Sequence, residues 1–385
     1  MRNIQQYLVS QRAEMIALTE KLVNIDSPST HLAGIKQVAT VLSEKMQSLG
    51  MQIRQIDQGK PGMVLVGELA GVKDQAPVIL SGHLDTVFPV GTAKARPFKV
   101  VGDKMLGPGV YDMKAGLVIG LFAIQALQRV SLLKRPLKMI IVSDEEKLHF
   151  DSRAAAIMAQ EVTGGAYGLN LEGAAKCTQI STHQRGGMII DITVHGKAAH
   201  SGIEPQKGRS AILELADKLP KLAALTDMTQ GIHVNCGMIS GGISENIIPD
   251  RAKVSLGVRF KNEKQRKDLL AKIIQITQEH LVLDTTTEVT VRTKIDSMEE
   301  TKQVKQLFAD LKQTAQRVNL LTLEAVGDSG ASDAGIMVTN GVPCLDGIGV
   351  VGDGAHTDQE FAKVSSMIER ASLLAEFIME QEWVK

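Results

Sequence analysis

The sequence has few of the residues that mark several common classes of protein. Aromatic residues make up only 3% of the 385 residues, which argues against a surface that stacks nucleic-acid bases. The three cysteines, Cys177, Cys236 and Cys344, are too few and too widely spaced for a disulfide framework or a cysteine-based zinc finger. Basic and acidic residues number 43 each, so no net charge attracts nucleic acid or an anionic membrane.

Long hydrophobic runs are also lacking. The longest, Gly116–Leu127, contains Gln125 and is shorter than the roughly 18 residues that a membrane span needs. No apolar stretch of signal-peptide length follows Met1. Hydrophobic residues at 44% and charged residues at 22% are typical of a globular protein with a sizeable core. We therefore expect a soluble, cytoplasmic protein with no nucleic-acid partner and no membrane partner.

The first half of the chain alternates predicted helices and strands. Helices are expected over 4–22, 33–48, 114–130 and 151–160. Strands are expected over 51–56, 63–69, 78–83, 137–143 and 167–171. Such alternation predicts an α/β domain with a largely parallel sheet, whose ligands bind at the carboxyl ends of the strands.

The pattern changes near residue 180. Apolar residues alternate with polar ones from Met188 to Val194, which predicts a half-exposed strand of an antiparallel sheet. Elements over 208–224, 233–239, 252–260, 262–282 and 288–292 complete a β-α-β-β-α-β order, as in a ferredoxin-like sandwich.

The α/β pattern returns with a helix over 301–319, a strand near Leu321, a strand within Pro343–Gly349 and a closing helix from Glu360. We therefore predict an α/β fold with a discontinuous larger domain, 1–180 and 295–385, and an inserted α+β domain, 181–294.

A possible metal ligand ends the predicted strand 78–83, where His83 and Asp85 are two residues apart. In an extended chain such residues point to the same side, so Asp85 can accept a hydrogen bond from the second ring nitrogen of a metal-bound His83. A purely structural His–Asp hydrogen bond at a strand end is the alternative.

Other acidic and imidazole groups follow other predicted elements. Asp112 lies in a glycine-rich loop before a helix, where it can also act as an N-cap. Taken singly, each of the other groups has an ordinary role as a solvated polar residue at the edge of a sheet. Because several strands of one sheet are expected to deliver them to one edge, we predict that a set of five converges there: His83, Asp112, Glu146, Glu172 and His356.

Two imidazoles and three carboxylates suit divalent zinc, and one carboxylate can bridge two ions. Three carboxylates and two zinc ions leave one positive charge, which a bound hydroxide neutralises. Glu145 is then a spare carboxylate beside a neutral cluster, placed to take a proton from metal-bound water and pass it to a leaving amine. The predicted cofactors are two Zn²⁺ ions, with Co²⁺ or Mn²⁺ as substitutes.

These motifs resemble those of the M20 co-catalytic metallopeptidases, a family with a zinc-exopeptidase-like catalytic domain. The resemblance rests on His83–Pro89, Gly109–Lys114, Asp144–Glu146 and Gly354–Thr357, and the first is most similar to the glutamate carboxypeptidase branch. It implies that Asp112 bridges two zinc ions. One ion would be held by His83 and Glu172, and the other by Glu146 and His356. Asp85 would orient a ligand, and Glu145 would be the general base and acid.

The resemblance extends to the inserted domain, which in this family is a lid and a dimerisation domain. His200 matches a histidine that reaches across the dimer interface and polarises the scissile carbonyl, although it can also be a simple turn residue. Asn246 and Arg259 would bind the substrate carboxylate and the oxyanion region, and Gly330 and Ser332 would lie beside the substrate backbone. A homodimer through the inserted domain is therefore expected.

The chain departs from the family pattern in several places. Lys147–Phe150 follows Asp-Glu-Glu where small residues are common, and these bulky groups are expected to narrow or reshape the pocket. Gly257 stands where an acidic residue is frequent, and Gly173 replaces a frequent proline. Cys344 replaces a frequent threonine and is interpreted as a buried small hydrophobic residue.

We therefore predict a zinc-dependent hydrolase of the carboxypeptidase type. It would cleave an amide or peptide bond next to a free carboxylate, with a C-terminal glutamate or a similar small peptide or N-acyl amino acid as substrate. An N-acyl-amino-acid deacylase or desuccinylase, or a dipeptidase, would use the same residues. A third hypothesis is an inactive, metal-bound dimeric scaffold.

Overall fold

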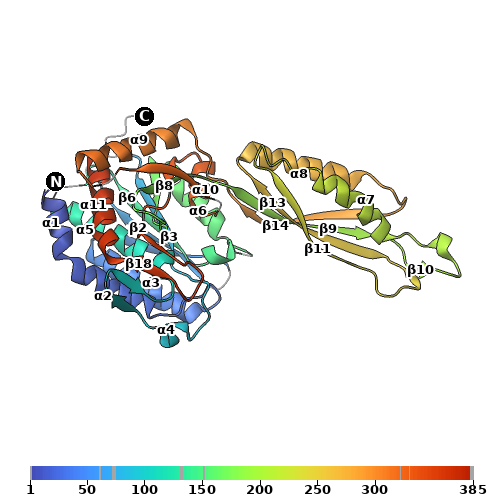
Figure 1. The fold of residues 1–385 in the computed structure, drawn as a ribbon, viewed down its shortest axis with the longest axis horizontal. Coiled ribbons are helices and arrows are strands. Elements are labelled where there is room, and N and C mark those ends of the chain that lie inside the picture. Colours follow the sequence, from blue (N-terminus) through green and yellow to red (C-terminus); the bar gives the residue numbers. More distant parts are fainter. Residues whose placement is uncertain are drawn as a thin grey trace. The chain divides into compact units, whose positions relative to one another are not determined.

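The computed structural model describes residues 2–59, 62–71, 75–130, 133–150, 152–320, 322–328 and 330–381. The chain forms two compact units (Figure 1). The larger comprises Met1–Gln184 and Glu300–Lys385, and the smaller comprises Arg185–Glu299. Both ends of the chain therefore contribute to the larger unit.

A six-stranded sheet forms the centre of the described part of the larger unit, in the order β1-β2-β6-β3-β7-β16. Its strands are β1 (Gln52–Asp57), β2 (Met63–Leu69), β3 (Val78–His83), β6 (Leu137–Val142), β7 (Tyr167–Asn170) and β16 (Cys344–Leu345). β6, β3, β7 and β16 run parallel, whereas β1 and β2 form an antiparallel edge. The predicted mixed α/β fold with a mainly parallel sheet is confirmed.

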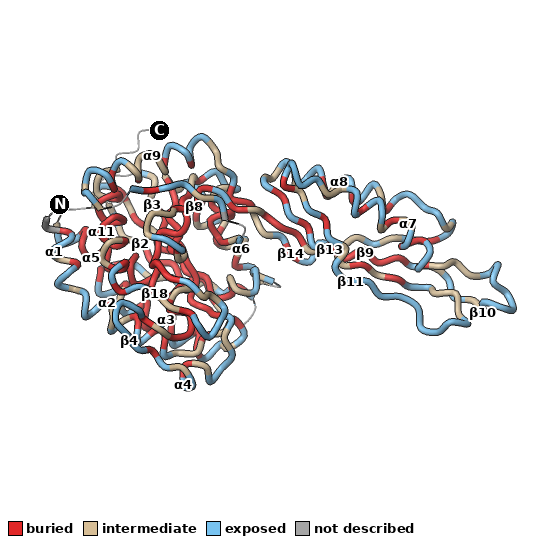
Figure 2. Tube along the Cα trace, viewed as in Figure 1, coloured by how far each residue is buried: buried red, intermediate tan, exposed pale blue. Residues whose placement is uncertain are grey.

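Helices cover both faces of this sheet. The aliphatic residues of β3, β6 and β7 are therefore buried almost throughout (Figure 2). The helices are α1 (Arg2–Ser10), α2 (Arg12–Val23), α3 (Leu32–Ser48), α5 (Ala115–Val130), α6 (Ala154–Val162), α9 (Lys302–Arg317), α10 (Ala334–Thr339) and α11 (Val364–Glu380). α5 packs against α11, α1 and α2. The stretch Val110–Val130 is apolar and long enough to cross a membrane, but 83% of its most apolar window is buried, as expected for a core helix.

A glycine brings α5 close to the end of β7. A Cβ atom on Gly116 would lie 2.0 Å from the backbone oxygen of Leu171, so no other residue fits there without a shift. The turn η1 (Val110–Lys114) precedes α5 and carries Asp112, while Leu171 precedes Glu172. The absent side chain of Gly116 thus allows two acidic groups from different elements to approach each other.

A second sheet of the larger unit has the order β17-β18-β5-β4 within the described residues. Its strands are β4 (Lys99–Val101), β5 (Lys104–Leu106), β17 (Gly352–Asp353) and β18 (Phe361–Lys363). The turn between β17 and β18 contains His356. A further strand, β8 (Gln179–Gln184), pairs in parallel with β15 (Glu324–Asp328) of the same unit.

The smaller unit contains a four-stranded antiparallel sheet of order β11-β13-β9-β14. Its elements are β9 (Gly186–His195), β10 (Ala199–His200), η3 (Pro205–Lys207), α7 (Ala211–Ala223), β11 (His233–Gly241), β12 (Ile247–Ile248), β13 (Arg251–Phe260), α8 (Glu263–Gln278) and β14 (Thr286–Ile295). α7 and α8 cover one face of the sheet (Figure 1). Alternate residues of β13 are buried, including Val254, Leu256 and Val258.

Several sequence-based expectations about single elements were wrong. The helix expected over 4–22 is interrupted between Ser10 and Arg12, where Gln11 has φ −91° and ψ 0°. The segment after His83 contains α4 (Thr92–Ala95) as well as β4 and β5, none of which was predicted. The closing helix begins at Val364, not at Glu360. Two expected positions, Asp151 and Leu321, lie outside the described residues.

We predict that Gly116→Ala lowers the free energy of unfolding by at least about 2 kcal/mol, because the added methyl group overlaps a backbone oxygen. Urea denaturation followed by circular dichroism measures this change. Gly257→Ala is the control, since a Cβ atom there has no neighbour within 4 Å. Equal stability of the two variants would show that the close approach of α5 and β7 is not constrained by residue 116.

Candidate metal centre

Two groups of possible metal ligands share one carboxylate. The first group contains His83, Asp112 and Glu172, and the second contains Asp112, Glu146 and His356. In each group one ligand atom per residue lies within 4.8 Å of the others. The structure therefore brings together all five residues that the sequence analysis selected as ligands.

Asp112 lies between the two imidazoles. Its Oδ1 is 2.9 Å from Nε2 of His83, and its Oδ2 is 3.1 Å from Nε2 of His356. Each oxygen of the Asp112 carboxylate therefore faces a different imidazole, and Asp112 belongs to both ligand groups. His83 Nε2 is also 3.4 Å from Glu172 Oε1, and His356 Nε2 is 3.0 Å from Glu146 Oε2.

Only some of these residues follow strands of the large sheet. His83 ends β3, and Glu146 and Glu172 come shortly after the neighbouring parallel strands β6 and β7. The expectation that all five follow strands of one sheet was wrong. Asp112 lies in the turn before α5, and His356 lies in the β17–β18 turn of the second sheet with a positive φ of 65°.

Neighbouring residues hold the ligands in place. His83 Nδ1 lies 3.1 Å from the backbone oxygen of Asp85 and 3.3 Å from its carboxylate Oδ1. The backbone oxygen and one carboxylate oxygen of Asp85 therefore both face this ring nitrogen. The other carboxylate oxygen of Asp85 accepts hydrogen bonds from the Ser29 hydroxyl at 2.6 Å and the Glu146 amide at 3.3 Å. Asp85 thus contacts residues of both ligand groups.

The loop that carries Asp112 is held by Glu360. This buried carboxylate accepts hydrogen bonds from the backbone amides of Gly109, Tyr111 and Asp112 at 2.8, 2.8 and 3.0 Å. Glu360 is four residues after His356 in the turn between β17 and β18. It therefore connects this turn to the loop of Asp112. Sequence analysis missed the roles of Ser29 and Glu360, because neither lies in a pattern that indicates contact with residues so distant in the chain.

The electrostatics of the cluster favour added positive charge. Burial raises the pKa of Glu172 to about 8 and the pKa of Glu146 to about 7, and nearby acidic groups add to both shifts. Burial opposes protonation of His83, but Glu172, Asp112 and Asp85 raise its pKa well above the ordinary value. With protein groups alone, ionising Glu146 and Glu172 is therefore less favourable than in water, and divalent cations would reverse that cost.

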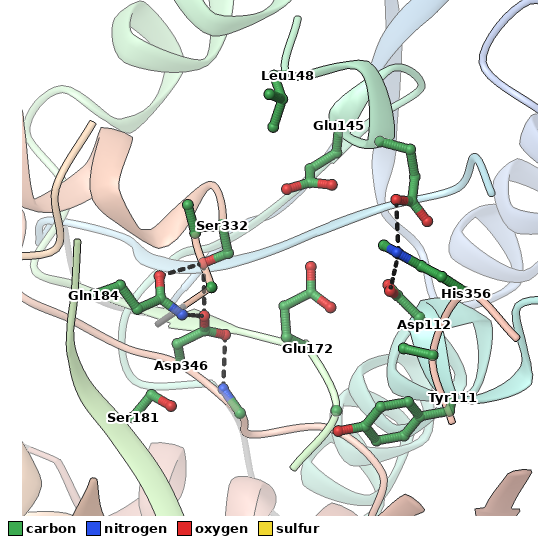
Figure 3. Close-up of a pocket in the computed structure, with 16 residues that line it drawn as sticks. Tyr111, Asp112, Glu145, Leu148, Glu172, Ser181, Gln184, Ser332, Asp346 and His356 are labelled. Carbon is green, nitrogen blue, oxygen red and sulfur yellow. Dashed lines mark hydrogen bonds and ion pairs between the residues drawn. The ribbon is translucent and has the colours of Figure 1, made fainter. Parts of the chain in front are cut away.

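Glu145 belongs to neither ligand group. It begins the short turn η2 (Glu145–Lys147), and its carboxylate points into the same pocket as Glu172 (Figure 3). Burial raises the pKa of Glu145 well above its usual range, although His83 acts in the opposite direction. A carboxyl group beside a metal site with a raised pKa has the properties of a general base and acid.

These side chains line a pocket of about 420 Å³. Its lining comprises Tyr111, Asp112, Glu145, Glu146, Leu148, Glu172, Gly173, Ser181, Gln184, Gly330, Ala331, Ser332, Asp346, Gly347, Ala355 and His356. Gly330 and Ser332, which were predicted to lie beside the substrate backbone, both line this pocket.

Comparison with known proteins agrees with this geometry. The profile of Peptidase family M20/M25/M40 matches residues 79–380. The chain belongs to this family. It is an M20 metallopeptidase or amidohydrolase, and its suspected resemblance to that family is confirmed.

Curated relatives of this M20 protein include enzymes with different substrates. Carboxypeptidase G2 from a Pseudomonas strain is 26% identical over 97% of this chain and 91% of its own length. Succinyl-diaminopimelate desuccinylase from Corynebacterium glutamicum is 28% identical over 68% of this chain and 70% of its own length.

Solved structures share the fold of this M20 protein. The aminopeptidase PepT from Bacillus cereus is 22% identical, with a TM-score of 0.76 over 96% of this chain and 99% of that one. A dinuclear metal-binding M20 peptidase from Bacillus subtilis is 15% identical, with a TM-score of 0.67 over 96% and 97% of the two chains.

A buried polar network adjoins the candidate metal ligands of this M20 protein. The Ser332 hydroxyl lies 2.6 Å from Asp346 Oδ2 and 2.9 Å from Gln184 Oε1. Asp346 also accepts hydrogen bonds from the Asn170 and Gln184 side-chain amides at 2.9 and 2.7 Å. The hydroxyl of Ser332 is therefore occupied by protein groups.

Three predicted site residues lie in the smaller unit. His200 pairs with Ile247 through β10 and β12, and the Asn246 carbonyl accepts a hydrogen bond from the Ser201 amide at 3.0 Å. His200 and Asn246 are therefore neighbours. Arg259 lies opposite Gly187 near the end of β13. At a rise of 3.3 Å per residue, it is about 26 Å along the strand from Arg251, the first residue of β13. Within this unit Arg259 is not brought together with the other two.

We predict that Asp112→Ala abolishes binding of both metal ions, whereas Glu172→Ala abolishes one, because only Asp112 belongs to both groups. Elemental analysis of protein dialysed against zinc gives the stoichiometry. A zinc content in the Asp112 variant equal to that of the wild type would rule out a shared carboxylate.

Proposed function

We propose that this M20 protein is a zinc-dependent hydrolase that cleaves an amide bond next to a free carboxylate. The observation that carries the proposal is the pair of ligand groups joined by Asp112, with Glu145 beside them and outside both groups. One zinc ion would be held by His83, Asp112 and Glu172. The other would be held by Asp112, Glu146 and His356.

The donor set favours zinc over magnesium or calcium. It combines imidazole nitrogens with carboxylate oxygens, whereas magnesium and calcium prefer oxygen ligands alone. When bound, such ions polarise the substrate carbonyl and lower the pKa of water. Co²⁺ or Mn²⁺ would substitute in the same donor set.

Glu145 would accept a proton from the attacking water and donate it to the leaving amine. Its carboxylate lies at the pocket beside both ligand groups, and its raised pKa brings it nearer the range in which a carboxyl can both accept and donate a proton. Asp85 would hold the His83 ring by its contacts with Nδ1.

Residues of the smaller unit would bind and polarise the substrate. Nδ1 of His200 accepts hydrogen bonds from the amides of Gly202 and Ile203 at 3.1 and 3.2 Å. A neutral His200 therefore carries its proton on Nε2, which suits a donor to a carbonyl oxygen. Asn246 beside it would contribute to the same region, and the planar guanidinium of Arg259 would pair with a substrate carboxylate.

The carboxypeptidase assignment is supported by the match of 97% of this chain to carboxypeptidase G2 and by the motif that ends in Val87, Phe88 and Pro89. A C-terminal glutamate or a similar residue is the proposed carboxylate-bearing group. Deacylation of an N-acyl or N-succinyl amino acid is the second candidate, supported by the match to the desuccinylase. Dipeptide hydrolysis would use the same groups, whereas an inactive scaffold would leave Glu145 without a role.

A panel of N-acyl glutamates, N-succinyl amino acids and dipeptides, assayed with added zinc, cobalt or manganese, tests the proposal. We expect turnover with an acyl glutamate or a close analogue. We also predict that Glu145→Ala lowers kcat by about 10³-fold or more while two metal ions remain bound, because only proton transfer is lost. Full turnover in this variant would remove Glu145 from the mechanism. No activity on the whole panel would favour the scaffold.

We also propose that the protein forms a homodimer through the smaller unit. β11 is an edge strand whose Met238 and Ile239 side chains are largely exposed, and α7 exposes Ile212 and Leu213. A Cβ atom on Gly241 would lie 3.1 Å from Ile212, so the apolar residues of α7 and β11 adjoin. An exposed apolar edge strand is prone to aggregation unless another chain covers it, and a second copy would do so.

Met238→Lys is predicted to convert the dimer to a monomer, since it places a charge in the proposed interface. Leu283→Lys, at an equally exposed leucine after α8, is the control and leaves the dimer intact. Light scattering coupled to size-exclusion chromatography measures the mass. A wild type that is monomeric, or a dimeric Met238 variant, would contradict the proposal.

The cytoplasmic location stays a prediction from composition.

A further inference from the structure

The segment Lys147–Phe150 follows Glu146, and His149 is its least exposed residue, with a side chain that is 10% exposed. Leu148 and His149 both have φ near 54°, in the left-handed region that residues with a side chain rarely adopt. Leu148 lines the pocket beside Glu145 (Figure 3). Two consecutive residues in this conformation cost free energy, which surrounding contacts must offset.

Both ring nitrogens of His149 contact carboxylates. Nδ1 lies 2.9 Å from Oδ1 of Asp144, and Nε2 lies 2.7 Å from Oδ1 of Asp333. The backbone amide of His149 also donates to the Asp144 carbonyl at 3.1 Å. A doubly protonated ring can donate to both carboxylates at once. Asp333 and Asp144 raise the pKa of His149 well above its usual value, although burial opposes this shift.

The two carboxylates belong to different parts of the site. Asp144 immediately precedes Glu145, and Asp333 immediately follows Ser332 and precedes α10. Within the described residues, Oδ2 of Asp333 is buried without a hydrogen-bond partner, and its Oδ1 contacts His149. His149 therefore connects the turn of Glu145 to the loop 330–333 across 184 residues of sequence.

We propose that His149 is a positioning residue that clamps the Glu145 turn to the loop 330–333 and so sets the orientation of Glu145 over the pocket. The inference rests on the proposed function, because its kinetic consequence requires Glu145 to transfer a proton. His149 itself does not line the pocket, so it acts through its neighbours. Small displacements of a catalytic group are sufficient to lower its efficiency.

The first experiment removes the clamp from each side. His149→Ala and Asp333→Ala should each lower kcat by about 10-fold or more, with KM changed by less than about 3-fold and metal content unchanged. Asp333→Asn is the matched partner of Asp333→Ala. Both remove the charge that acts on Glu145, but only asparagine keeps an oxygen that accepts from His149, so it should retain most of kcat. Equal losses in the two Asp333 variants would overturn the proposal.

A double-mutant cycle then tests the coupling. If one clamp explains both effects, His149→Ala combined with Asp333→Ala should lower kcat no more than about 3-fold beyond the weaker single variant. Independent roles would instead multiply the two losses. His280→Ala is the control, since His280 also pairs with a carboxylate, Glu214 at 3.0 Å, but belongs to the smaller unit. Its kcat should stay within about 2-fold of the wild type.

Hydrogen–deuterium exchange supplies a readout that needs no substrate. Asp333→Ala should raise exchange in peptides covering 144–150, and His149→Ala should raise exchange in peptides covering 330–340. Local effects alone, without this reciprocity, would contradict the clamp. A wild type inactive on every substrate would instead count against the proposed function and leave the exchange result intact. If His149→Ala does not fold, the comparison of the two Asp333 variants still decides.

Discussion

The attraction between clustered carboxylates and divalent cations is the interaction on which the rest of this site depends. Asp112 lies between two imidazoles, and Glu146 and Glu172 are close on either side. Burial makes the ionised forms of the two glutamates unfavourable, as their raised pKa values show. The fold nevertheless assembles these groups, and it does so by close backbone approach, as at Gly116, and by hydrogen bonds to the loop of Asp112. A structure that concentrates negative charge in this way is organised for cations.

Part of this site could be predicted from the sequence because parallel strands deliver their final residues to one edge. His83, Glu146 and Glu172 follow three adjacent strands, and an apolar run before each of them shows this in the sequence. Asp112 and His356 lie in the turn before α5 and in the β17–β18 turn, so they reach the cluster from positions that the strand-end argument did not foresee. The mainly parallel sheet was likewise predictable, whereas short elements such as α4 and β4 were not, since they are too brief to show a period.

The residues that sequence reasoning missed act through long-range contacts. Ser29 reaches Asp85 across 56 positions, and His149 reaches Asp333 across 184. Neither serine nor histidine has a local pattern that indicates such a partner. The segment of His149 was recognised only as unusual. Its bulk was expected to reshape the pocket, and the structure shows that Leu148 does line the pocket, while His149 turns away from it to meet two carboxylates.

The discontinuity of the larger unit has a consequence for the order in which the protein is made. His356, which completes the second ligand group, and Glu360, which holds the Asp112 loop, are synthesised after the whole of the smaller unit. During translation, the acidic strand ends therefore emerge from the ribosome long before their partners do. The smaller unit is one continuous segment, Arg185–Glu299, and all of its residues precede the C-terminal part. The smaller unit of a nascent chain can thus be complete before His356, β18 and α11 have been synthesised.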